Sequence, residues 1–122
     1  MAGDEDLRRK RQALEERVER IRRQFLASLP RRVGELQRCW RSCAAPAQEG
    51  AALEALWRAA HTLKGASGTF GEHGIGAAAA AVDGVVRLAL ERGTGLTGKE
   101  RRQIETAIAR LGRLAREVQR GQ

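Results

Sequence analysis

One short segment combines a possible nucleophile with residues that a helix does not normally favour: His61, Lys64, Gly65 and Gly68. The imidazole of a histidine is partly unprotonated at neutral pH, and its ring nitrogen can attack and carry a phosphoryl group. A phosphoryl group brings nearly two negative charges, which the ammonium group of Lys64, one helical turn away, would balance. Each interior glycine costs a helix roughly 0.5–1 kcal/mol relative to alanine, so the two glycines need an explanation.

Helical spacing places these residues together on one outward face. The apolar stripe of the same segment, which must face a core, consists of Leu53, Leu56, Ala60, Leu63, Ser67 and Phe70. His61 lies one position past Ala60, so its side chain projects away from that stripe. The outward face carries Trp57, Arg58, His61, Lys64, Gly65 and Gly68. This face therefore offers an exposed nucleophile, two cations and bare backbone that another protein can approach.

Apolar residues recur at helical spacing along almost the whole chain, and this periodicity predicts helices. The composition agrees, because alanine and leucine dominate the apolar residues and only two phenylalanines, two tryptophans and no tyrosine are present. The expected helices cover about residues 4–25, 31–44, 49–70, 75–92 and 98–118. Pro30 predicts a kink or a break between the first two. Thr97 and Glu100 predict a capping box that starts the last helix.

Short turns between amphipathic helices of this length make antiparallel neighbours. The sequence therefore predicts an all-α fold, namely an antiparallel four-helix bundle with an additional N-terminal helix. Residues 1–24 would form that charged accessory helix, and residues 25–120 would form the bundle.

The net charge of +8 permits nucleic acid, an anionic membrane or an acidic protein as a partner. The arginines alternate with glutamates on the helical stretches, which favours solvated faces. The longest apolar run, residues 77–82, is far too short to span a membrane, and the acidic N-terminus is unlike a signal peptide. Cys39 and Cys43 are expected to be reduced thiols, and no metal-ligand set accompanies them. We expect a soluble, cytoplasmic protein without a metal.

Residues 61–71, with the sequence HTLKGASGTFG, resemble the signature of histidine phosphotransfer (HPt) domains of two-component phosphorelays. That signature is His-x-Leu-Lys-Gly followed by small residues and often by Phe-Gly. Residues from about 25 to 118 also match the layout of the family, which is a four-helix bundle. The resemblance implies that His61 is the phosphoacceptor and Lys64 the neighbouring cation. It also implies that Gly65 and Gly68 give clearance to a docking receiver domain, with Trp57 and Arg58 beside them.

The resemblance further implies a phosphocarrier that is not an enzyme with its own ATP site. The partners would be a hybrid sensor histidine kinase and the receiver domain of a response regulator, whose aspartate exchanges the phosphoryl group with His61. The chain would hold no cofactor, because the Mg²⁺ ion would lie on the receiver. Asp83 stands where many members of the family carry glutamate, and the sequence assigns no role to it.

Two other functions fit parts of the sequence. The basic charge and the arginine-rich first helix permit a helical nucleic-acid-binding protein. Against this, glutamates interrupt the arginines and no recognition motif is present. A helical scaffold that pairs through an N-terminal stripe is the other alternative, and it is compatible with phosphotransfer. That stripe consists of Leu7, Leu14, Val18 and Ile21.

Overall fold

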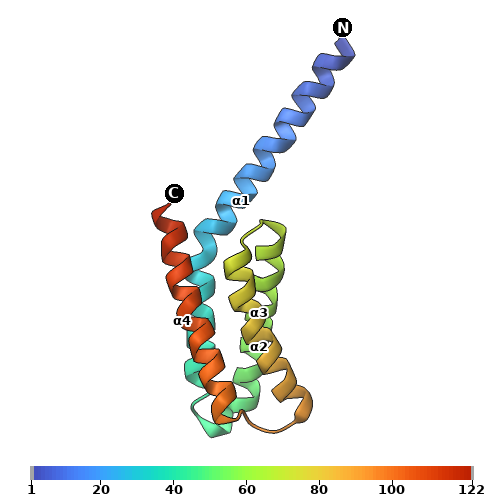
Figure 1. Cartoon of the computed structure of the whole chain (residues 1–122). Coiled ribbons are helices and arrows are strands. Elements are labelled where there is room, and N and C mark those ends of the chain that lie inside the picture. Colours follow the sequence, from blue (N-terminus) through green and yellow to red (C-terminus); the bar gives the residue numbers. More distant parts are fainter. Residues whose placement is uncertain (1, 122) are drawn as a thin grey trace.

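The computed structural model describes residues 2–121, apart from the side chains at positions 2 and 48. This part of the chain consists of helices joined by short turns, without a strand. The elements are α1 (Ala2–Ser42), the 3-10 helix η1 (Pro46–Gln48), α2 (Glu49–Thr69), α3 (His73–Arg92) and α4 (Gly98–Arg120). Figure 1 shows that successive helices run in opposite directions. The predicted all-α fold and antiparallel four-helix bundle are therefore confirmed.

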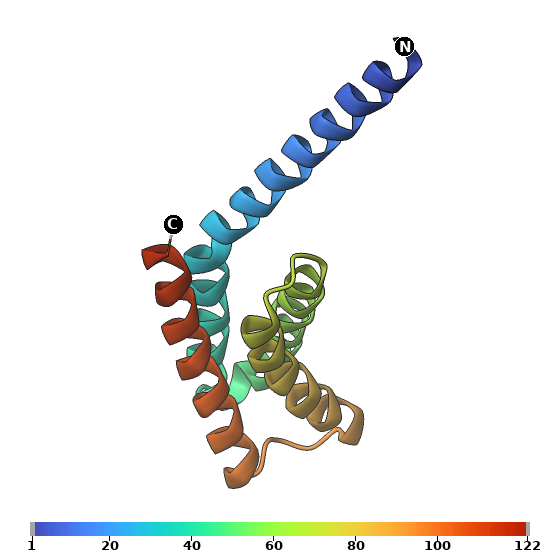
Figure 2. The same ribbon diagram turned by 45° about the horizontal axis from the view of Figure 1, so that its top comes forward.

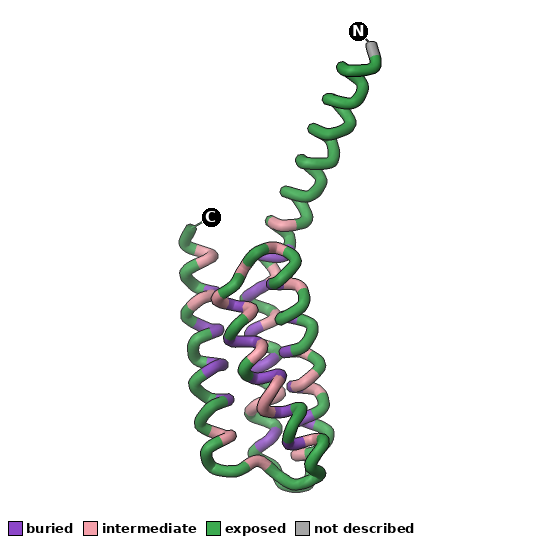
Figure 3. Tube along the Cα trace, turned by 45° about the vertical axis from the view of Figure 1, so that its right-hand side comes forward, coloured by how far each residue is buried: buried purple, intermediate pink, exposed green. Residues whose placement is uncertain are grey.

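The core lies between the four helices. In contact with one another are α1 and α2, α2 and α3, α3 and α4, and α4 and α1, so the helices close into a ring. The apolar stripes predicted from the sequence meet inside it, and Figure 3 shows the buried residues along the facing sides. The largest fully buried apolar side chains are Leu26, Leu29, Leu36, Leu56, Leu63, Val82, Val86, Ile104 and Leu111.

The first helix is longer than expected, because residues 2–42 form one helix with Pro30 inside it. The additional N-terminal helix is therefore not confirmed as a separate element; residues 2–24 are the first part of α1. Proline lacks the N–H that would bond the carbonyl of Leu26. Here the side-chain Nε2 of Gln119 in α4 donates to that carbonyl oxygen at 2.7 Å. Figure 2 shows a bend without a break where α1 enters the bundle.

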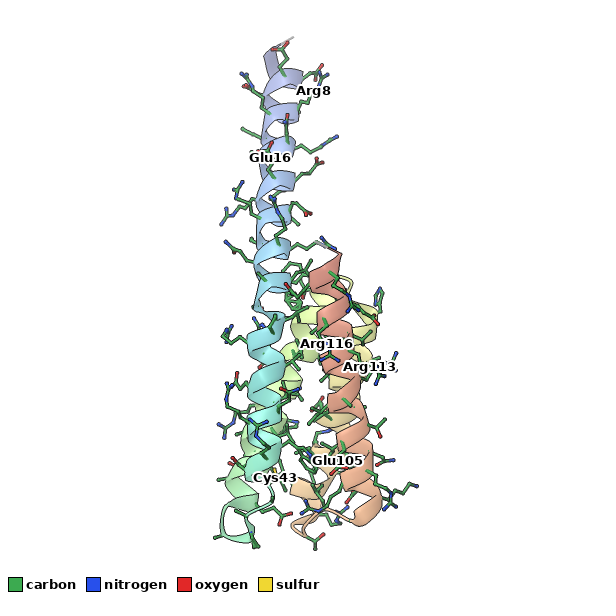
Figure 4. All side chains as sticks on the ribbon, turned by 90° about the vertical axis from the view of Figure 1, so that its left-hand side faces the viewer. Arg8, Glu16, Cys43, Glu105, Arg113 and Arg116 are labelled. Carbon is green, nitrogen blue, oxygen red and sulfur yellow. The ribbon has the colours of Figure 1, made fainter. Side chains whose placement is uncertain are left out.

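The N-terminal part of α1 projects beyond the bundle (Figures 1 and 3). Every residue from 3 to 21 is exposed, and the first buried residue is Phe25. Figure 4 shows the charged side chains of this part, Arg8 and Glu16 among them, radiating away from the helix. Among the residues that the structure describes, none packs against this part of the helix.

The helix ends follow from local chemistry. Gly71 and Gly93 adopt positive φ angles of 72° and 75°, which glycine reaches without strain, and they end α2 and α3. The predicted capping box of α4 is present. The hydroxyl of Thr97 accepts from the backbone N–H of Glu100 at 3.1 Å, and the carboxylate of Glu100 accepts from the backbone N–H of Thr97 at 2.8 Å.

By length and composition alone, α3 could cross a membrane. Its buried residues, however, face the other helices and include the charged Asp83. A helix of a soluble bundle can have the same average composition, because one of its faces packs into the core. The composition of α3 therefore does not indicate a membrane span.

Candidate functional site

The outward face of α2 carries His61, as the helical spacing predicts. Its side chain is 58% exposed. Ala60 and Leu63, on the opposite side of the same turn, are almost fully buried. The two buried neighbours fix the rotation of α2, and the imidazole is consequently presented to solvent by a helix anchored in the core.

An acidic side chain of the next helix lies beneath this face. Asp83 of α3 is buried, and its Oδ2 lies 3.3 Å from the Nζ of Lys64 and 3.5 Å from the Nδ1 of His61. Lys64 donates a hydrogen bond to Oδ2. The other oxygen, Oδ1, is buried without a hydrogen-bond partner among the described residues. Asp83 thus joins His61 and Lys64 into one cluster that spans two helices.

Sequence reasoning missed this role of Asp83. The signal was present, because Asp83 is the one charged residue in the otherwise apolar stretch from Ile75 to Val86. It also lies on the buried side of that stretch, four residues after Ala79 and three before Val86. A buried carboxylate is costly unless a cation or hydrogen-bond donor faces it, so such an acid points to a site.

An aromatic ring holds the imidazole from the other direction. The rings of Trp57 and His61 stack with their centroids 5.1 Å apart and an interplanar angle of 23°. Trp57 is half-buried, and its indole Nε1 is buried with no partner in the part of the chain that the structure describes. With Nδ1 of His61 turned toward Asp83 and one ring face against Trp57, the second ring nitrogen, Nε2, remains for reaction.

The two glycines of the motif lie open beside His61. Gly65 and Gly68 are exposed, and a Cβ atom added at either would meet nothing within 4 Å. Gly76 of α3 differs, because a Cβ there would lie 3.4 Å from the Cβ of Ser67 and would press on the helix interface. Packing within this chain therefore explains Gly76 but does not require glycine at positions 65 and 68.

Arg58 lies on the opposite flank of His61 from Asp83. Its Nη2 is 3.4 Å from Oε2 of Glu54, and both side chains are mostly exposed. Arg58 also lines a small groove of about 270 Å³ between α1 and α2. The cations predicted beside His61 thus differ in setting: Lys64 belongs to the Asp83 cluster, whereas Arg58 belongs to a separate surface pair.

The cysteines lie away from this site. Cys39 and Cys43 are free thiols at the end of α1 (Cys43 is labelled in Figure 4). Burial, with Glu49 nearby, raises the pKa of the Cys43 thiol to about 11, and burial also raises the pKa of Cys39. Both are therefore poor nucleophiles at neutral pH. Across the described residues, no three metal-ligating side chains come together.

The fold and the site agree with a known protein family. A sequence model of the Hpt domain matches residues 12–115, which is most of the chain. Searches of the curated proteins and of the solved structures found no match. The match confirms the resemblance carried by residues 61–71, and the helical bundle fits the fold of the family. The chain therefore belongs to the Hpt domain family, whose members are phosphocarrier modules of two-component phosphorelays.

Proposed function

We propose that the protein relays a phosphoryl group through His61. The group arrives from a hybrid sensor histidine kinase or a phosphorylated receiver domain, and it leaves to the aspartate of a response regulator. The observation that carries the proposal is the exposed imidazole, held between Trp57 and Asp83 beside two glycines that the bundle does not need. A rigid, accessible nucleophile with clearance around it suits exchange with docking proteins.

The contact with Asp83 defines how His61 would react. A neutral imidazole with its proton on Nδ1, facing the carboxylate, has a lone pair on Nε2. In transfer from a receiver, Nε2 attacks phosphorus and the N–P bond forms. The P–O bond to the aspartate of the receiver breaks, and its electron pair returns to that carboxylate. No proton has to leave Nε2, and the positive charge that develops on the ring lies 3.5 Å from Asp83.

Lys64 supplies the cation for the phosphoryl oxygens. Its side chain is half-exposed, and the hydrogen bond to Asp83 keeps the ammonium group next to the imidazole. Removing it in a Lys64→Ala variant should weaken the stabilisation of the transferring group by roughly 1–3 kcal/mol, the scale of a charge-assisted hydrogen bond. Asp83 thus acts as a positioning residue for both His61 and Lys64.

The same proposal assigns the remaining chemistry to the partners. The receiver provides the aspartate and holds Mg²⁺, a kinase loads the histidine, and this chain contributes neither an ATP site nor a metal ion. The exchange takes place in the cytoplasm, and neither nucleic acid nor a membrane is among the proposed partners.

The chain offers a matched pair of variants for testing the phosphoacceptor. The protein would be incubated with a receiver domain phosphorylated by acetyl phosphate, and acid-labile, alkali-stable phosphate on this chain would be measured. We expect labelling of the wild type and of His73→Gln, which alters the other histidine, exposed at the start of α3. His61→Gln should take up none and keep its helical circular dichroism. Labelling of a folded His61→Gln variant would contradict the proposal.

The exposed basic side chains of α1 keep nucleic-acid binding as the competing function. Residues 3–21 are exposed, but acidic side chains at positions 4–6, 15, 16 and 19 share this surface with the arginines. We therefore expect weak DNA binding at physiological salt, whether or not residues 1–22 are present, and phosphotransfer that survives their deletion. Tight, steeply salt-dependent binding that is lost with this segment would support the competing function.

A further inference from the structure

Trp57 is the aromatic side chain against which the reactive imidazole lies. Its ring stacks on the ring of His61 with centroids 5.1 Å apart and an interplanar angle of 23°. The face of an indole ring is electron-rich and attracts a cation within about 6 Å of its centre, more strongly than the ring of phenylalanine does. We propose that Trp57 stabilises the positively charged ring of phosphorylated His61 and thereby shifts the transfer equilibrium toward this chain. This inference rests on the proposed function of His61.

Phosphorylation from a receiver makes the imidazole a cation. The lone pair on Nε2 forms the N–P bond, the P–O bond to the aspartate of the receiver breaks with its electron pair, and the proton on Nδ1 stays in place. The ring of His61 therefore gains one positive charge, while the negative charge of the phosphoryl group lies on its oxygens. A contact that favours the charged ring over the neutral ring favours the phosphorylated state by the same free energy.

The carboxylate beneath the ring faces a second cation at the same time. Oδ2 of Asp83 lies 3.3 Å from the Nζ of Lys64 and 3.5 Å from the Nδ1 of His61. Its single negative charge is therefore shared between two cations once the ring of His61 is positive. Trp57 stacks on the face of that ring, so it does not compete with Asp83 for Nδ1 at the ring edge. The indole thus supplies a second electron-rich contact to the charged ring.

Packing alone does not account for an indole at position 57. Trp57 is half-buried, and its Nε1 is buried without a hydrogen-bond partner in the described part of the chain. An unpaired buried N–H costs free energy, and a leucine or a phenylalanine would pack at this position without that cost. A residue that breaks a local rule in an otherwise regular helix indicates a role beyond packing.

The transfer equilibrium separates this role from docking and from orientation of the ring. The equilibrium constant between the dissociated proteins depends only on the free energies of their phosphorylated and unphosphorylated forms. A contact of Trp57 with the receiver changes the forward and the reverse rate by the same factor, and so does an effect on the ring that is equal in both forms. Only a contact that distinguishes the charged ring from the neutral ring changes the equilibrium constant.

The first experiment measures this constant with the full chain. Forward and reverse transfer with one receiver domain, at subsaturating concentration, give it as the ratio of the two second-order rate constants. Trp57→Leu should shift the constant about 2- to 30-fold toward the receiver, which is the range of a cation–π contact, and Trp57→Phe should shift it less. The matched control is Trp40→Leu, which removes the other tryptophan. Trp40 is also half-buried, and its ring faces the guanidinium of Arg101 at 5.8 Å, so this variant should keep the wild-type constant.

A second measurement needs neither a receiver nor a change at position 57. Phosphoramidate phosphorylates accessible imidazoles directly, and in a Trp40→Phe chain the tryptophan fluorescence comes from Trp57 alone. This fluorescence should change when acid-labile phosphate appears on the chain, because the stacked ring becomes a cation. It should stay constant in the Trp40→Phe/His61→Gln chain, whose remaining histidine is His73.

Each contrary result has a defined meaning. An unchanged equilibrium constant in a Trp57→Leu variant that keeps its helical circular dichroism rejects this inference and leaves the proposed function intact. An equal shift in Trp40→Leu rejects it as well, because loss of a distant ring would then have the same effect. Unchanged fluorescence of the phosphorylated Trp40→Phe chain rejects it even if Trp57→Leu does not fold. A wild type that takes up no phosphate from the receiver rejects the proposed function and this inference together.

Discussion

Replacing Gly65 with glutamine separates the stability of the bundle from its docking to a partner. A Cβ at this position meets nothing within 4 Å, so the added side chain strains no contact in the chain. Glutamine is a better helix former than glycine, and the variant should be more stable by roughly 0.5 kcal/mol. For 122 residues this raises Tm by about 2 °C, from an unfolding entropy of about 2.1 cal/mol/K per residue.

Phosphotransfer should change in the opposite direction. The glutamine would lie one helical turn after His61 on the same face, in the space that a docking receiver must enter. Overpacking an interface costs typically 1–3 kcal/mol. The corresponding loss in single-turnover transfer from a phosphorylated receiver, measured by rapid quench at subsaturating concentration, is about 5- to 150-fold.

The matched control is Gly34→Gln in α1. A Cβ there makes only an ordinary 3.5 Å contact with Nη1 of Arg38, so the gain in helix stability should be similar while transfer stays at the wild-type rate. Wild-type transfer by a stabilised Gly65→Gln variant would refute the assignment of Gly65 to docking. A less stable variant would show that the helix requires glycine for an internal reason.

Three further predictions concern the site and the helix ends. Asp83→Asn should slow transfer from a phosphorylated receiver about 10- to 100-fold and leave the fold intact, because it removes the charge that faces the imidazole but keeps the shape of the side chain. An unchanged rate would exclude the positioning role of Asp83. Gln119→Ala should lower the free energy of unfolding in urea by about 0.5–1.5 kcal/mol, because it removes the side-chain donor to the carbonyl of Leu26 in a part-buried hydrogen bond. Adding Pro30→Ala should restore part of this loss by returning the backbone N–H; an equal effect of Gln119→Ala in both backgrounds would show that this hydrogen bond is not the cause. Hydrogen bonds from Arg92 and from the N–H of Thr97 lower the pKa of Glu100 to about 2 from an ordinary value of 4.5. The stability that the ionised carboxylate contributes is therefore present above about pH 4.5 and is lost as the pH falls toward 2. In urea unfolding, Glu100→Gln should lose less of its free energy of unfolding over that pH range than the wild type.

Local patterns in the sequence were sufficient for most of the fold. The apolar stripes determine which face of each helix is buried, and the capping box at Thr97 determines where α4 begins, because both depend on residues close together in the chain. Whether Pro30 would bend the first helix or break it was not predictable in the same way. In the structure the carbonyl of Leu26, which lacks the N–H of residue 30 as a donor, accepts from the side chain of Gln119, 93 residues later, and no local pattern reveals that contact.

In the candidate site, too, the features set within one helix were predictable and those set by the packing of two helices were not. The outward direction of His61 and the open surface at Gly65 are properties of a single helix, so spacing alone predicts them. The contact of Asp83 with His61 depends on the register of α3 against α2, and only the packed structure supplies that register. Likewise, the sequence does not determine which rotamer Arg58 adopts. In the structure its side chain pairs with Glu54 and not with the Asp83 cluster.

The joining of α2 to α3 by the short turn at residues 70–72 has a consequence for folding kinetics. All contacts of the cluster arise within one helical hairpin, since His61 and Asp83 are only 22 positions apart in the chain. Loop closure over so short a distance is fast, and helical proteins dominated by contacts of this kind fold within microseconds to milliseconds. A chain that unfolds transiently should therefore rebuild the geometry around His61 within that time.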